Sequence, residues 1–524
     1  MIIRSVSTGR LAAAAAHTEA ALAVHAPHLV NGFIANLPHA ADTVGRRLRA
    51  ALVREELTPA FARGRVHAFN RVEYPNAGVN DPVDLLAGLD NGTFAAEIRN
   101  AVLNLAIAMS RLTPGQPQTN PDDEAVRLER LAVAGHNLHP CGRTRLGWDT
   151  VDVLAHDLEA GHTTIGFLAV RDDHHLGDDL ATRLALPAAP PGYRTQPVHA
   201  WQRELVTSRY PELFADGALR PLDGHLDAIP TAALRTLLLP GTGTYLKLSL
   251  DIQVTSTRRS ISVASTRNGP ALSTLLHRLV ADDPDGHRLL LMAETHGAAV
   301  PTASTGRDLS AIARDGLTGH LQPGEHAVPG SALPAHDPTT GTTVLAGLVD
   351  TSGLGAAAWL TAYTRLLLPP LLRLATRGIA LEAHLQNCLP TFIAGRPHRL
   401  ALRDFAGLRL HPGRLTTAGH TLTLWPGSVV GTDDLDLMRA KLGYTALQAH
   451  LGELVIRLEE THGLPEDHAW RIVRDIVDET YDTIGGHPDH AYFTAPTIPH
   501  KALVRMRLAG EGDIYLPVGN PLHG

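Results

Sequence analysis

Residues 379–387 read IALEAHLQN and alternate apolar with polar side chains, a pattern that could place reactive groups in a row. Successive side chains of an extended strand point to opposite faces, so the apolar residues would pack in the core. Glu382, His384 and Gln386 would then share the other face, and the run stops at Asn387. An acid, an imidazole and an amide on one face predict a strand that presents a binding site.

A second carboxylate in a neighbouring extended segment suggests what Glu382 could do. The sequence HRLALRDFAGLRL, residues 398–410, predicts a hairpin that carries Asp404. Two carboxylates on adjacent strands suit a hard Mg²⁺ ion that also holds substrate phosphates. A structural salt-bridge pair is the alternative interpretation of the same acids.

Histidine and arginine crowd a glycine-bounded loop at residues 135–147, GHNLHPCGRTRLG. His136 and His139 have a spacing that could ligate a metal, but no carboxylate or thiolate follows at a customary distance. Arg143 and Arg145 add positive charge to the same loop. We therefore favour an anion-binding loop over a metal site.

Basic and hydroxyl side chains recur in two later segments. Arg235 and Thr236 follow a predicted turn, and alone they indicate little. The segment YLKLSLDIQVTS, residues 245–256, alternates apolar with polar residues, which predicts a strand with one core face. Its polar face carries Lys247 and Thr255, followed closely by Ser256, Arg258 and Arg259. A solvated edge strand is the competing interpretation.

These clusters combine many cationic donors with a carboxylate pair, in a chain whose net charge is −7. A triphosphate and a second anionic substrate would need that mixture. The sequence contains no Walker-type GxxxxGK[ST], no dinucleotide fingerprint, and no HExxH, paired CxxC or GxSxG motif. The chemistry that this favours is Mg·ATP-dependent activation of a carboxylate by scattered residues.

Length and composition limit what can position these residues. At 524 residues and 56.0 kDa the chain is too long for one core, and usual domain sizes suggest about three. The net charge and a pI near 6.5 give no global attraction to nucleic acid or to an anionic membrane. No apolar run approaches the ~20 residues of a membrane span. Two cysteines and an N-terminal stretch that indicates an amphipathic helix, not a secretory signal, predict a cytoplasmic protein.

The order of elements predicts an α+β protein. Helical periodicity is expected in residues 11–25, 42–57, 94–112, 356–376 and 435–484. A proline-rich linker at 113–123 precedes a helix that Asp122 or Asp123 could cap. Residues 150–300 turn towards strands, and a Gly/Pro-rich stretch at 322–342 marks a second boundary. This order predicts a helical N-terminal domain, a β-rich middle domain and an α+β C-terminal domain.

Five segments, in order along the chain, resemble one known family. They are GHNLHPCGRTRLG, LKLSLDIQVTSTRRSIS, GIALEAHLQNCLP, LRDFAGLRL and the terminal KALVRMRL…VGNPL. Together they are similar to the NRPS-independent siderophore synthetases, the aerobactin-synthetase (IucA/IucC) family. No single motif is decisive, but five in the right order are specific, and the resemblance runs from residue 125 to the C-terminus. The preceding residues match only in their helical character.

The resemblance implies an ATP-dependent ligase that uses Mg²⁺ and forms an acyl adenylate. A carboxylate of citrate, or of a citrate or dicarboxylate derivative, would attack the α-phosphate of ATP and release pyrophosphate. An amine, hydroxylamine or alcohol would then take the acyl group from AMP. The implied fold is a cupped hand, commonly a homodimer, with a helical thumb at 1–120, β-rich fingers at 121–320 and an α+β palm at 321–524.

The resemblance also implies roles for individual residues. The implied ATP-binding set is His136, Arg143, Arg235, Thr236, Lys247, Gln386 and Asn387. The implied substrate-binding set is Thr255, Ser256, Arg259 and His384, and the metal ligands are Glu382 and Asp404. The catalytic residues would be His384, Arg259 and Lys501, the last of which would reach the activated carboxylate.

Three departures from the family pattern bear on activity. The loop commonly reads HPxHPxxK, whereas here Asn137 replaces the first proline and Arg143 the lysine. Arginine keeps the charge but replaces a point ammonium by a planar fork. Ala233 stands where a serine is usual, which removes a hydroxyl donor near phosphate. A divergent substrate, the same chemistry in another chelator or metabolite pathway, and a catalytically silent ligand-binding paralogue therefore stay open.

Overall fold

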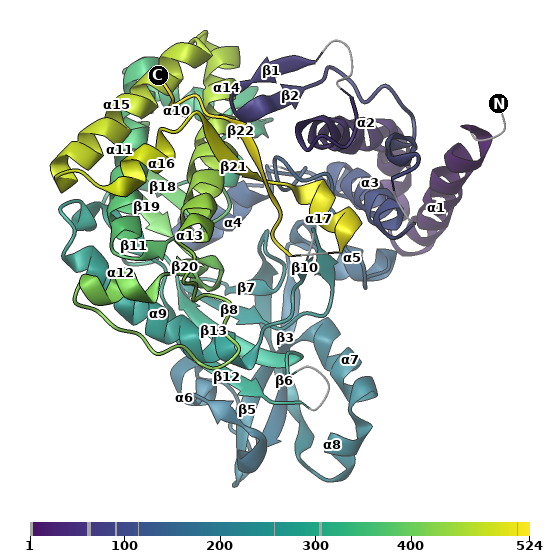
Figure 1. Ribbon diagram of the computed structural model, residues 1–524. Coiled ribbons are helices and arrows are strands. Elements are labelled where there is room, and N and C mark those ends of the chain that lie inside the picture. The colour runs from purple at the N-terminus through teal and green to yellow at the C-terminus, as the bar shows by residue number, and fades with distance from the viewer. Residues whose placement is uncertain are drawn as a thin grey trace.

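The computed structural model confirms an α+β protein (Figure 1). It describes residues 4–59, 64–89, 92–113, 115–255, 257–302, 306–510 and 512–524. Helices form the N-terminal part, a large sheet occupies the middle of the chain, and helices with smaller sheets make up the C-terminal part. No single described helix is long and apolar enough to cross a bilayer, and one helix pair reaches that composition only with a 105° bend between its members.

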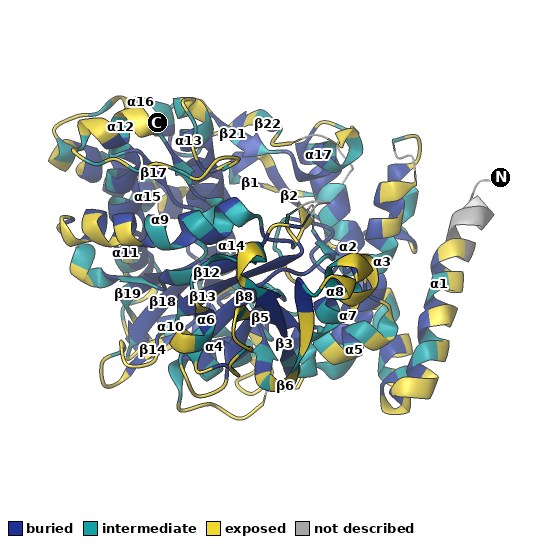
Figure 2. Ribbon diagram, turned by 90° about the horizontal axis from the view of Figure 1, so that it is seen from below, coloured by how far each residue is buried: buried dark blue, intermediate teal, exposed yellow. Residues whose placement is uncertain are grey.

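Three long helices form the N-terminal part, namely α1 (Arg4–His25), α2 (Val30–Arg54) and α3 (Thr93–Arg111). They confirm the helices predicted from the periodicity of the sequence. In α2 the buried residues Ala41, Val44, Leu48 and Leu52 recur every three or four positions, which gives the helix one core-facing stripe. Helix α1 stands at the outer edge of this bundle (Figure 2). A hairpin of β1 (Arg65–His67) and β2 (Arg71–Glu73) lies between α2 and α3 in the chain.

An eight-stranded sheet fills the middle of the chain in the order β4-β12-β13-β8-β7-β6-β3-β5, with every neighbour antiparallel. Its strands are β3 (Thr163–Arg171), β4 (Leu176–Gly177), β5 (Tyr193–His199), β6 (Leu219–Pro230), β7 (Thr236–Leu239), β8 (Thr244–Leu248), β12 (Glu294–Val300) and β13 (Leu309–Asp315). Because β8 lies between β7 and β13, its side chains are at the centre of the sheet.

The predicted strand at 245–256 is shorter than its alternation suggested. The ladder ends at Leu248, and the chain then forms a separate hairpin of β9 (Gln253–Val254) and β10 (Thr257–Arg258). Thr255 turns this hairpin with φ 56°, a conformation that a continuous strand cannot contain. The apolar face is nevertheless buried as predicted, because Leu250, Ile252 and Val254 pack into the N-terminal helical core.

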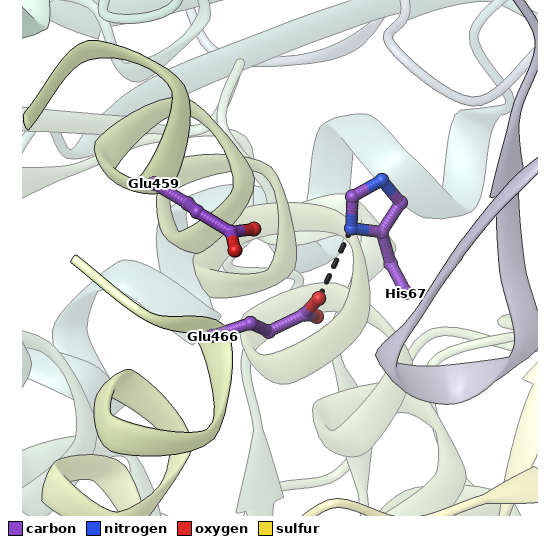
Figure 3. Close-up of side chains that lie close together, drawn as sticks. All are labelled: His67, Glu459 and Glu466. Carbon is purple, nitrogen blue, oxygen red and sulfur yellow. Dashed lines mark hydrogen bonds and ion pairs between the residues drawn. The ribbon is translucent and has the colours of Figure 1, made fainter. Parts of the chain in front are cut away.

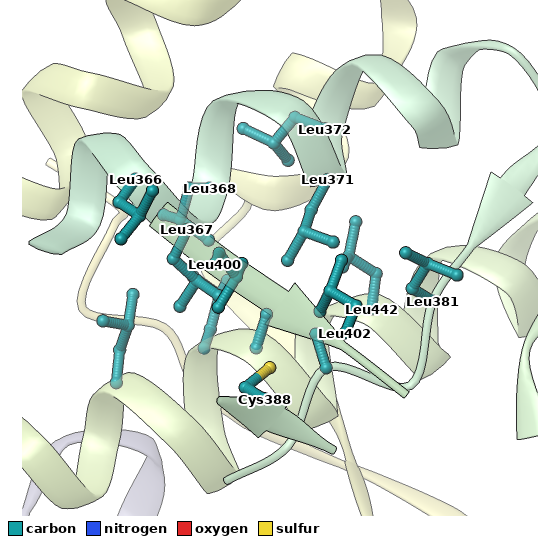
Figure 4. Close-up of a cluster of buried hydrophobic side chains, with 14 of the residues drawn as sticks. Leu366, Leu367, Leu368, Leu371, Leu372, Leu381, Cys388, Leu400, Leu402 and Leu442 are labelled. Carbon is teal, nitrogen blue, oxygen red and sulfur yellow. The ribbon is translucent and has the colours of Figure 1, made fainter. Parts of the chain in front are cut away.

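The C-terminal part has its own sheet, in the order β11-β19-β18-β14. Its strands are β11 (Leu289–Leu291), β14 (Glu325–Ala327), β18 (Cys388–Ile393) and β19 (Arg396–Leu402). Strand β14 comes from the stretch at 322–342, so that stretch belongs to the sheet as well as marking a boundary. Helix α11 (Ala356–Thr376) lies where the periodicity predicted it and packs its leucines against β19 (Figure 4). Each fully buried leucine contributes about 1.5–3 kcal/mol to folding.

Two predictions about the strands around Glu382 are wrong in detail. Only β17 (Ile379–Ala380) is laddered, and the chain then runs as an irregular segment to β18. Its burial still alternates as predicted, with Leu381, Ala383 and Leu385 buried and the polar residues between them half-buried. The hairpin expected at 398–410 does not form, because β19 pairs with β18 and β11 while β20 (Arg409–Leu410) pairs with β17.

The helix after the proline-rich linker, α4 (Pro121–Glu129), begins earlier than predicted. Asn120 caps it by accepting hydrogen bonds from the amides of Asp122 and Asp123 at 2.9 and 3.2 Å. Pro121 occupies the first helical position, which suits a residue without an amide hydrogen. Asp122 is instead buried and accepts a hydrogen bond from the Tyr245 hydroxyl at 2.9 Å.

The remaining helices and strands connect or cover these layers. They are α5 (Thr150–His156), α6 (Leu180–Leu184), α7 (Ala200–Arg209), α8 (Pro211–Ala215), α9 (Val263–Ala281), α10 (Val344–Ser352), α12 (Pro412–Thr417), α13 (Leu435–Leu442), a π-helix (Gly443–Leu451), α14 (Gly452–His462), α15 (Glu466–Ile484), α16 (Pro488–Phe493), α17 (Leu503–Ala509), β15 (His336–Asp337), β16 (Thr342–Thr343), β21 (Thr497–Lys501) and β22 (Tyr515–Gly519). The helical run from α13 to α15 confirms the helices predicted at 435–484.

Candidate active site

Asp404 and Glu382 come from separate segments of the C-terminal part and meet at a turn. Asp404 follows β19 with φ 63° and ψ 72°, in the left-handed region that is costly for a non-glycine residue. The turn continues to Gly407, where an added Cβ would collide with Glu382 Oε2. Both acids also act on the pKa of His384 and of Arg259, so the two carboxylates face one space.

A lysine from the large sheet holds Asp404. Lys247 on β8 is 1% exposed, and its Nζ lies 2.6 Å from Asp404 Oδ1 and 2.9 Å from Glu294 Oε1. Burial would raise the pKa of the Asp404 carboxyl, but Lys247 and then Arg235 outweigh burial and hold that pKa well below its usual range. Asp404 is therefore a carboxylate at neutral pH.

A second lysine holds Glu382. Lys441, near the end of α13, donates from Nζ to Glu382 Oε1 at 2.8 Å. Burial would raise the pKa of Glu382, but Lys441, followed by His384, lowers it to about 2. The two carboxylates are thus both ionised, each beside its own ammonium group, and their side chains are 26% and 27% exposed. Hard anionic oxygens that stay accessible are what a Mg²⁺ ion requires of its ligands.

Three histidines line the same region as neutral rings. The ring of His136 lies 6.2 Å from that of His139 and 6.4 Å from that of His384. His136 Nδ1 accepts hydrogen bonds from the amides of Leu138 and His139, which leaves the proton on Nε2. Burial lowers the pKa of all three rings, that of His139 to about 3. The site therefore offers neutral N–H donors in addition to its fixed charges.

Arg259 and Arg235 bring positive charge to the same space. Arg235 donates from Nη1 to the carbonyls of Arg259 and Ser260, each at 3.3 Å. These hydrogen bonds hold the chain directly after β10. Arg259 donates from Nη2 to Thr255 Oγ1 at 3.3 Å, and its Nε is buried without a hydrogen-bond acceptor among the described residues. Burial and then Arg235 lower the pKa of Arg259 to about 10. A buried N–H without an acceptor suits an anionic ligand.

Three of the eight described non-glycine residues with positive φ lie at these positions. Leu234, Thr255 and Asp404 have φ of 61°, 56° and 63°, and each lies in or next to a turn that presents a site side chain. Leu234 precedes Arg235, whose amide bonds back to the Ala233 carbonyl at 2.7 Å. Such conformations persist where the surrounding structure enforces them, which often occurs at functional sites.

The other predicted residues lie around this centre. Thr236 on β7 pairs directly with Lys247, and Asn387 donates from its side chain to the Glu382 carbonyl at 3.0 Å. The Gln386 carbonyl accepts from Arg403 Nε at 3.0 Å, which ties the 384–387 turn to β19. Lys501, at the end of β21, pairs with Asp513 at 2.7 Å and lowers the pKa of both His136 and Glu382 through its field. Lys501 is thus brought to the site from the C-terminal part.

One predicted residue, Arg143, stands apart from this centre. Arg143 donates to the Val133 carbonyl at 2.6 Å and pairs with Asp157 and Glu159, in a cluster whose side chains are 1–3% exposed. Its guanidinium is committed to the protein interior, so its contacts do not support the predicted role in binding ATP. Ser256 lies outside the described residues.

Comparisons with known proteins agree with this arrangement. Residues 124–335 match the model of the IucA / IucC family, and residues 357–516 match a second model described as a ferric iron reductase FhuF-like transporter. The D-ornithine–citrate ligase of Staphylococcus aureus is 24% identical over 531 residues, which cover 87% of this chain and 81% of that protein. Residues 124–335 of this chain are thus an IucA/IucC-family domain.

Solved structures from the family share its fold. The petrobactin biosynthesis protein AsbB of Bacillus anthracis superposes with a TM-score of 0.82 at 20% identity, covering 95% of this chain and 98% of that one. The ATP-bound aerobactin synthetase IucA of Klebsiella pneumoniae gives a TM-score of 0.75 at 21% identity, covering 92% and 100%. At these identities the likeness establishes the fold alone.

Sequence reasoning missed Glu294 and Lys441, although the composition held a signal for the second. Of the 46 lysine and arginine residues only three are lysines, and the structure places Lys247, Lys441 and Lys501 together around the candidate site. Each is paired with a carboxylate at 2.6–2.9 Å. Because every other lysine or arginine position holds arginine, the three lysines were candidates as a class. Glu294 carried a weaker signal, as an acid within an apolar run.

A separate group of possible metal ligands joins the N-terminal hairpin to the C-terminal helices. His67, Glu459 and Glu466 each place one ligand atom within 4.8 Å of the others (Figure 3). Glu466 accepts from His67 Nδ1 at 3.0 Å and from the Ala68 amide at 2.8 Å, while Glu459 pairs with Arg65 at 2.6 Å. Because protein donors already hold both acids, we interpret this group as a structural link rather than a metal site.

Proposed function

We propose that this chain is an ATP-dependent ligase that adenylates a carboxylate of citrate, or of a citrate or dicarboxylate derivative, in siderophore biosynthesis. An amine, hydroxylamine or alcohol then takes the acyl group, and the products are AMP and pyrophosphate. The observation that carries the proposal is the convergence of three lysines and two arginines on the ionised pair Glu382 and Asp404. The named activity of the D-ornithine–citrate ligase relative supports the citrate class.

The donors present fit Mg²⁺ and the phosphates of ATP. Glu382 and Asp404 would hold the ion, since both are ionised and a quarter exposed. Bound there, Mg²⁺ would neutralise charge on the phosphates. Lys247 would contribute a point charge to the triphosphate, and Glu294 would keep its ammonium in place when Asp404 turns to the metal. Arg235, Thr236, His136, Gln386 and Asn387 stay predicted nucleotide contacts.

Arg259 and His384 would hold the acyl substrate, with Thr255 beside them. Arg259 has one buried N–H to offer, and His384 is a neutral ring whose N–H can donate to a carboxylate oxygen. Both hydrogen bonds would orient the attacking carboxylate towards the α-phosphorus. Lys501, at the end of β21, would stabilise negative charge on the activated carboxylate.

Two of the departures from the family pattern, at Asn137 and Arg143, do not remove any of these groups. Asn137 donates to the Ala449 carbonyl and to Glu453, each at 3.0 Å, and Arg143 is likewise held by protein acids. Both substitutions therefore have structural partners away from the ionised pair. This favours an active ligase over a silent ligand-binding paralogue.

The decisive experiment is ATP–pyrophosphate exchange with Mg²⁺ over a panel of di- and tricarboxylates. We expect exchange that depends on the added carboxylate, with AMP and pyrophosphate as products when a suitable amine is present. ADP as the main nucleotide product would overturn the adenylating mechanism. Nucleotide binding without exchange for any member of the panel would favour the silent paralogue.

We also propose that the ligase works as a cytoplasmic homodimer with thumb, fingers and palm at 1–120, 121–320 and 321–524. The cysteines Cys141 and Cys388 are both unpaired and buried, which suits a reducing compartment. Core packing crosses these boundaries at several places, because β11 pairs with β19, the leucines of α9 pack into the C-terminal core, and both α17 and the segment 250–254 pack against the N-terminal helices. Light scattering on the purified chain tests the dimer.

A further inference from the structure

A cavity of about 330 Å³ lies between α2, β2 and α14, beside the loop that carries His136. One face of α2 forms a wall of it, through Thr43, Arg46, Arg47, Ala50, Ala51 and Arg54. Two alanines between the arginines keep the space open. Leu138 and His500 line it as well, whereas Glu382, Asp404 and Lys247 are not among the described residues around it. The cavity therefore lies next to the candidate active site but is not lined by its carboxylates or by Lys247.

Two of the arginines at this cavity are fully paired. Arg71 lies 2.7 Å from both Glu73 and Glu453. Arg457 contacts the same two acids at 2.6 and 3.1 Å, and Glu460 at 2.5 Å. Glu73, Glu453 and Glu460 are thereby held by Arg71 and Arg457, and Arg46 on α2 pairs with Asp42 at 3.0 Å. Glu453 acts on Arg47 through its field without forming an ion pair with it among the described residues.

Arg47 and Arg54 are in a different situation. Arg47 donates from Nη1 to the Ala134 carbonyl at 2.6 Å, and Arg54 donates to the Phe69 carbonyl at 3.0 Å and to Gln448 Oε1 at 3.3 Å. In the part of the chain that the structure describes, neither guanidinium makes an ion pair with a carboxylate. Both guanidinium groups bind only neutral oxygens, and the Arg54 residue is buried, with 9% of its surface exposed.

The acid nearest in sequence, Glu55, acts on Arg54 through its field but forms no ion pair with either arginine among the described residues. Glu55 accepts hydrogen bonds from the amides of Val504 and Arg505 at 3.0 and 2.7 Å, and burial raises its pKa to about 7. Burial lowers the pKa of Arg47 to about 10 and that of Arg54 to about 9. Buried cations without an anion are costly, and a bound anion would remove that cost.

We infer that this cavity is a second ligand site, which binds a small carboxylate or phosphate anion between Arg47 and Arg54. The planar guanidinium fork matches both oxyanions in geometry. The cavity volume lies at the lower end of small-molecule pockets, about 300–1,000 Å³, so the ligand is compact. Ala50, Val72 and Leu138 supply an apolar wall for a short carbon chain. The site does not depend on the proposed reaction.

The test is calorimetric titration of the full chain with inorganic phosphate and, separately, with citrate, at constant ionic strength set by chloride. Arg47→Gln removes a charge that makes a single hydrogen bond, and Ala50→Leu fills the cavity without changing any charge. Arg278→Gln, on the exposed side of α9, is the matched control for the loss of an arginine. Arg259→Ala separates binding at the active site from binding in the cavity.

We expect saturable binding that weakens about 10–100-fold in Arg47→Gln, since a charge-assisted hydrogen bond contributes roughly 1.5–3 kcal/mol. Ala50→Leu should abolish it, while Arg278→Gln and Arg259→Ala retain it. Tighter binding of phosphate than of citrate assigns the natural ligand to phosphates, and the reverse assigns it to carboxylates. No saturable binding of either anion to the wild-type chain, or binding that Arg47→Gln and Ala50→Leu leave unchanged, would overturn the inference.

Discussion

Two buried groups of charges in this protein differ in how completely they are satisfied. The loop cluster, Arg143, Arg145, Asp157 and Glu159, has side chains that are 1–3% exposed, and each acid meets an arginine. The site group, Lys247, Glu294, Asp404, Lys441 and Glu382, is buried on its lysine side, but Asp404 and Glu382 are 27% and 26% exposed. The first group uses its charges to hold the fold, whereas the second keeps two carboxylates open to a ligand.

The largest effect should follow from removing a carboxylate of the site group. Asp404→Asn and Glu382→Gln should each lower pyrophosphate exchange about a thousand-fold, because a metal contributes several kcal/mol of charge stabilisation. Asparagine tolerates the left-handed backbone at position 404 better than alanine does. The unfolding free energy measured in urea should change little for Asp404→Asn, because Lys247 keeps its ion pair with Glu294. Exchange within ten-fold of wild type in both variants would rule out a shared metal site.

The loop cluster should respond in stability instead. Asp157→Ala leaves Arg145 buried with only carbonyl acceptors, and breaking such a pair costs about 3–5 kcal/mol of unfolding free energy. Asp315→Ala is the control, because its pair with Arg183 is about 40% exposed and such pairs contribute at most about 1 kcal/mol. Equal losses for the two variants, measured by urea unfolding, would remove the distinction between the groups.

Lys441 offers a test that is specific to the site group. Lys441→Met removes the cation that outweighs burial at Glu382, so the pKa of Glu382 should rise and its ionised fraction at a given acidic pH should fall. We expect exchange to drop about 10–100-fold and the acid limb of its pH profile to move towards neutral pH. Lys441→Arg keeps the charge and should restore most of the activity. A lower rate with an unmoved acid limb would assign Lys441 a purely structural role.

Arg259 and His384 should separate substrate binding from nucleotide binding. Arg259→Ala and His384→Ala should each raise the KM for the carboxylate about 10–100-fold, the worth of one buried charge-assisted hydrogen bond. ATP binding measured without the acid should stay within a few-fold of wild type. If both variants lose ATP binding and keep carboxylate affinity, the substrate pocket has been assigned to the wrong residues.

The sequence predicted the burial pattern better than the hydrogen bonding. Glu382, His384 and Gln386 share a half-buried face as expected, yet the segment is not a laddered strand, and β19 pairs with β18 and β11 instead. Periodicity reports which side chains are buried, while strand pairing depends on contacts distant in sequence. Positive φ at Thr255 and Asp404 leaves no signal in side-chain alternation.

Charge partners were the least predictable feature. Arg143 and Arg259 are both arginines near glycine or serine. Only the folded chain reveals that Arg143 pairs with Asp157 and Glu159, while Arg259 forms no ion pair with a carboxylate in the part of the chain that is described. Lys441 lies 59 positions from Glu382, and no local pattern links the two. The three lysines could have been singled out by their rarity, but their common location could not.

The smallest expected effect concerns His139, whose contacts place it with the satisfied groups rather than with the open carboxylates. His139 Nδ1 accepts from the Cys141 amide at 2.9 Å, and burial lowers its pKa to about 3 from an ordinary 6.5. The unfolded chain binds a proton there below pH 6.5 while the folded chain does not, so this contribution to stability is present above that pH and is lost as the pH falls towards 3.

In His139→Asn the amide oxygen can still accept from the Cys141 amide, but the titrating group is gone. The unfolding free energy of the wild type should therefore fall more steeply between pH 7 and 5 than that of the variant, by at most about 1.4 kcal/mol per pH unit. Parallel pH dependences for the two proteins, measured by urea unfolding, would mean that His139 protonates equally well in the folded state, and hence that its surroundings are open rather than satisfied.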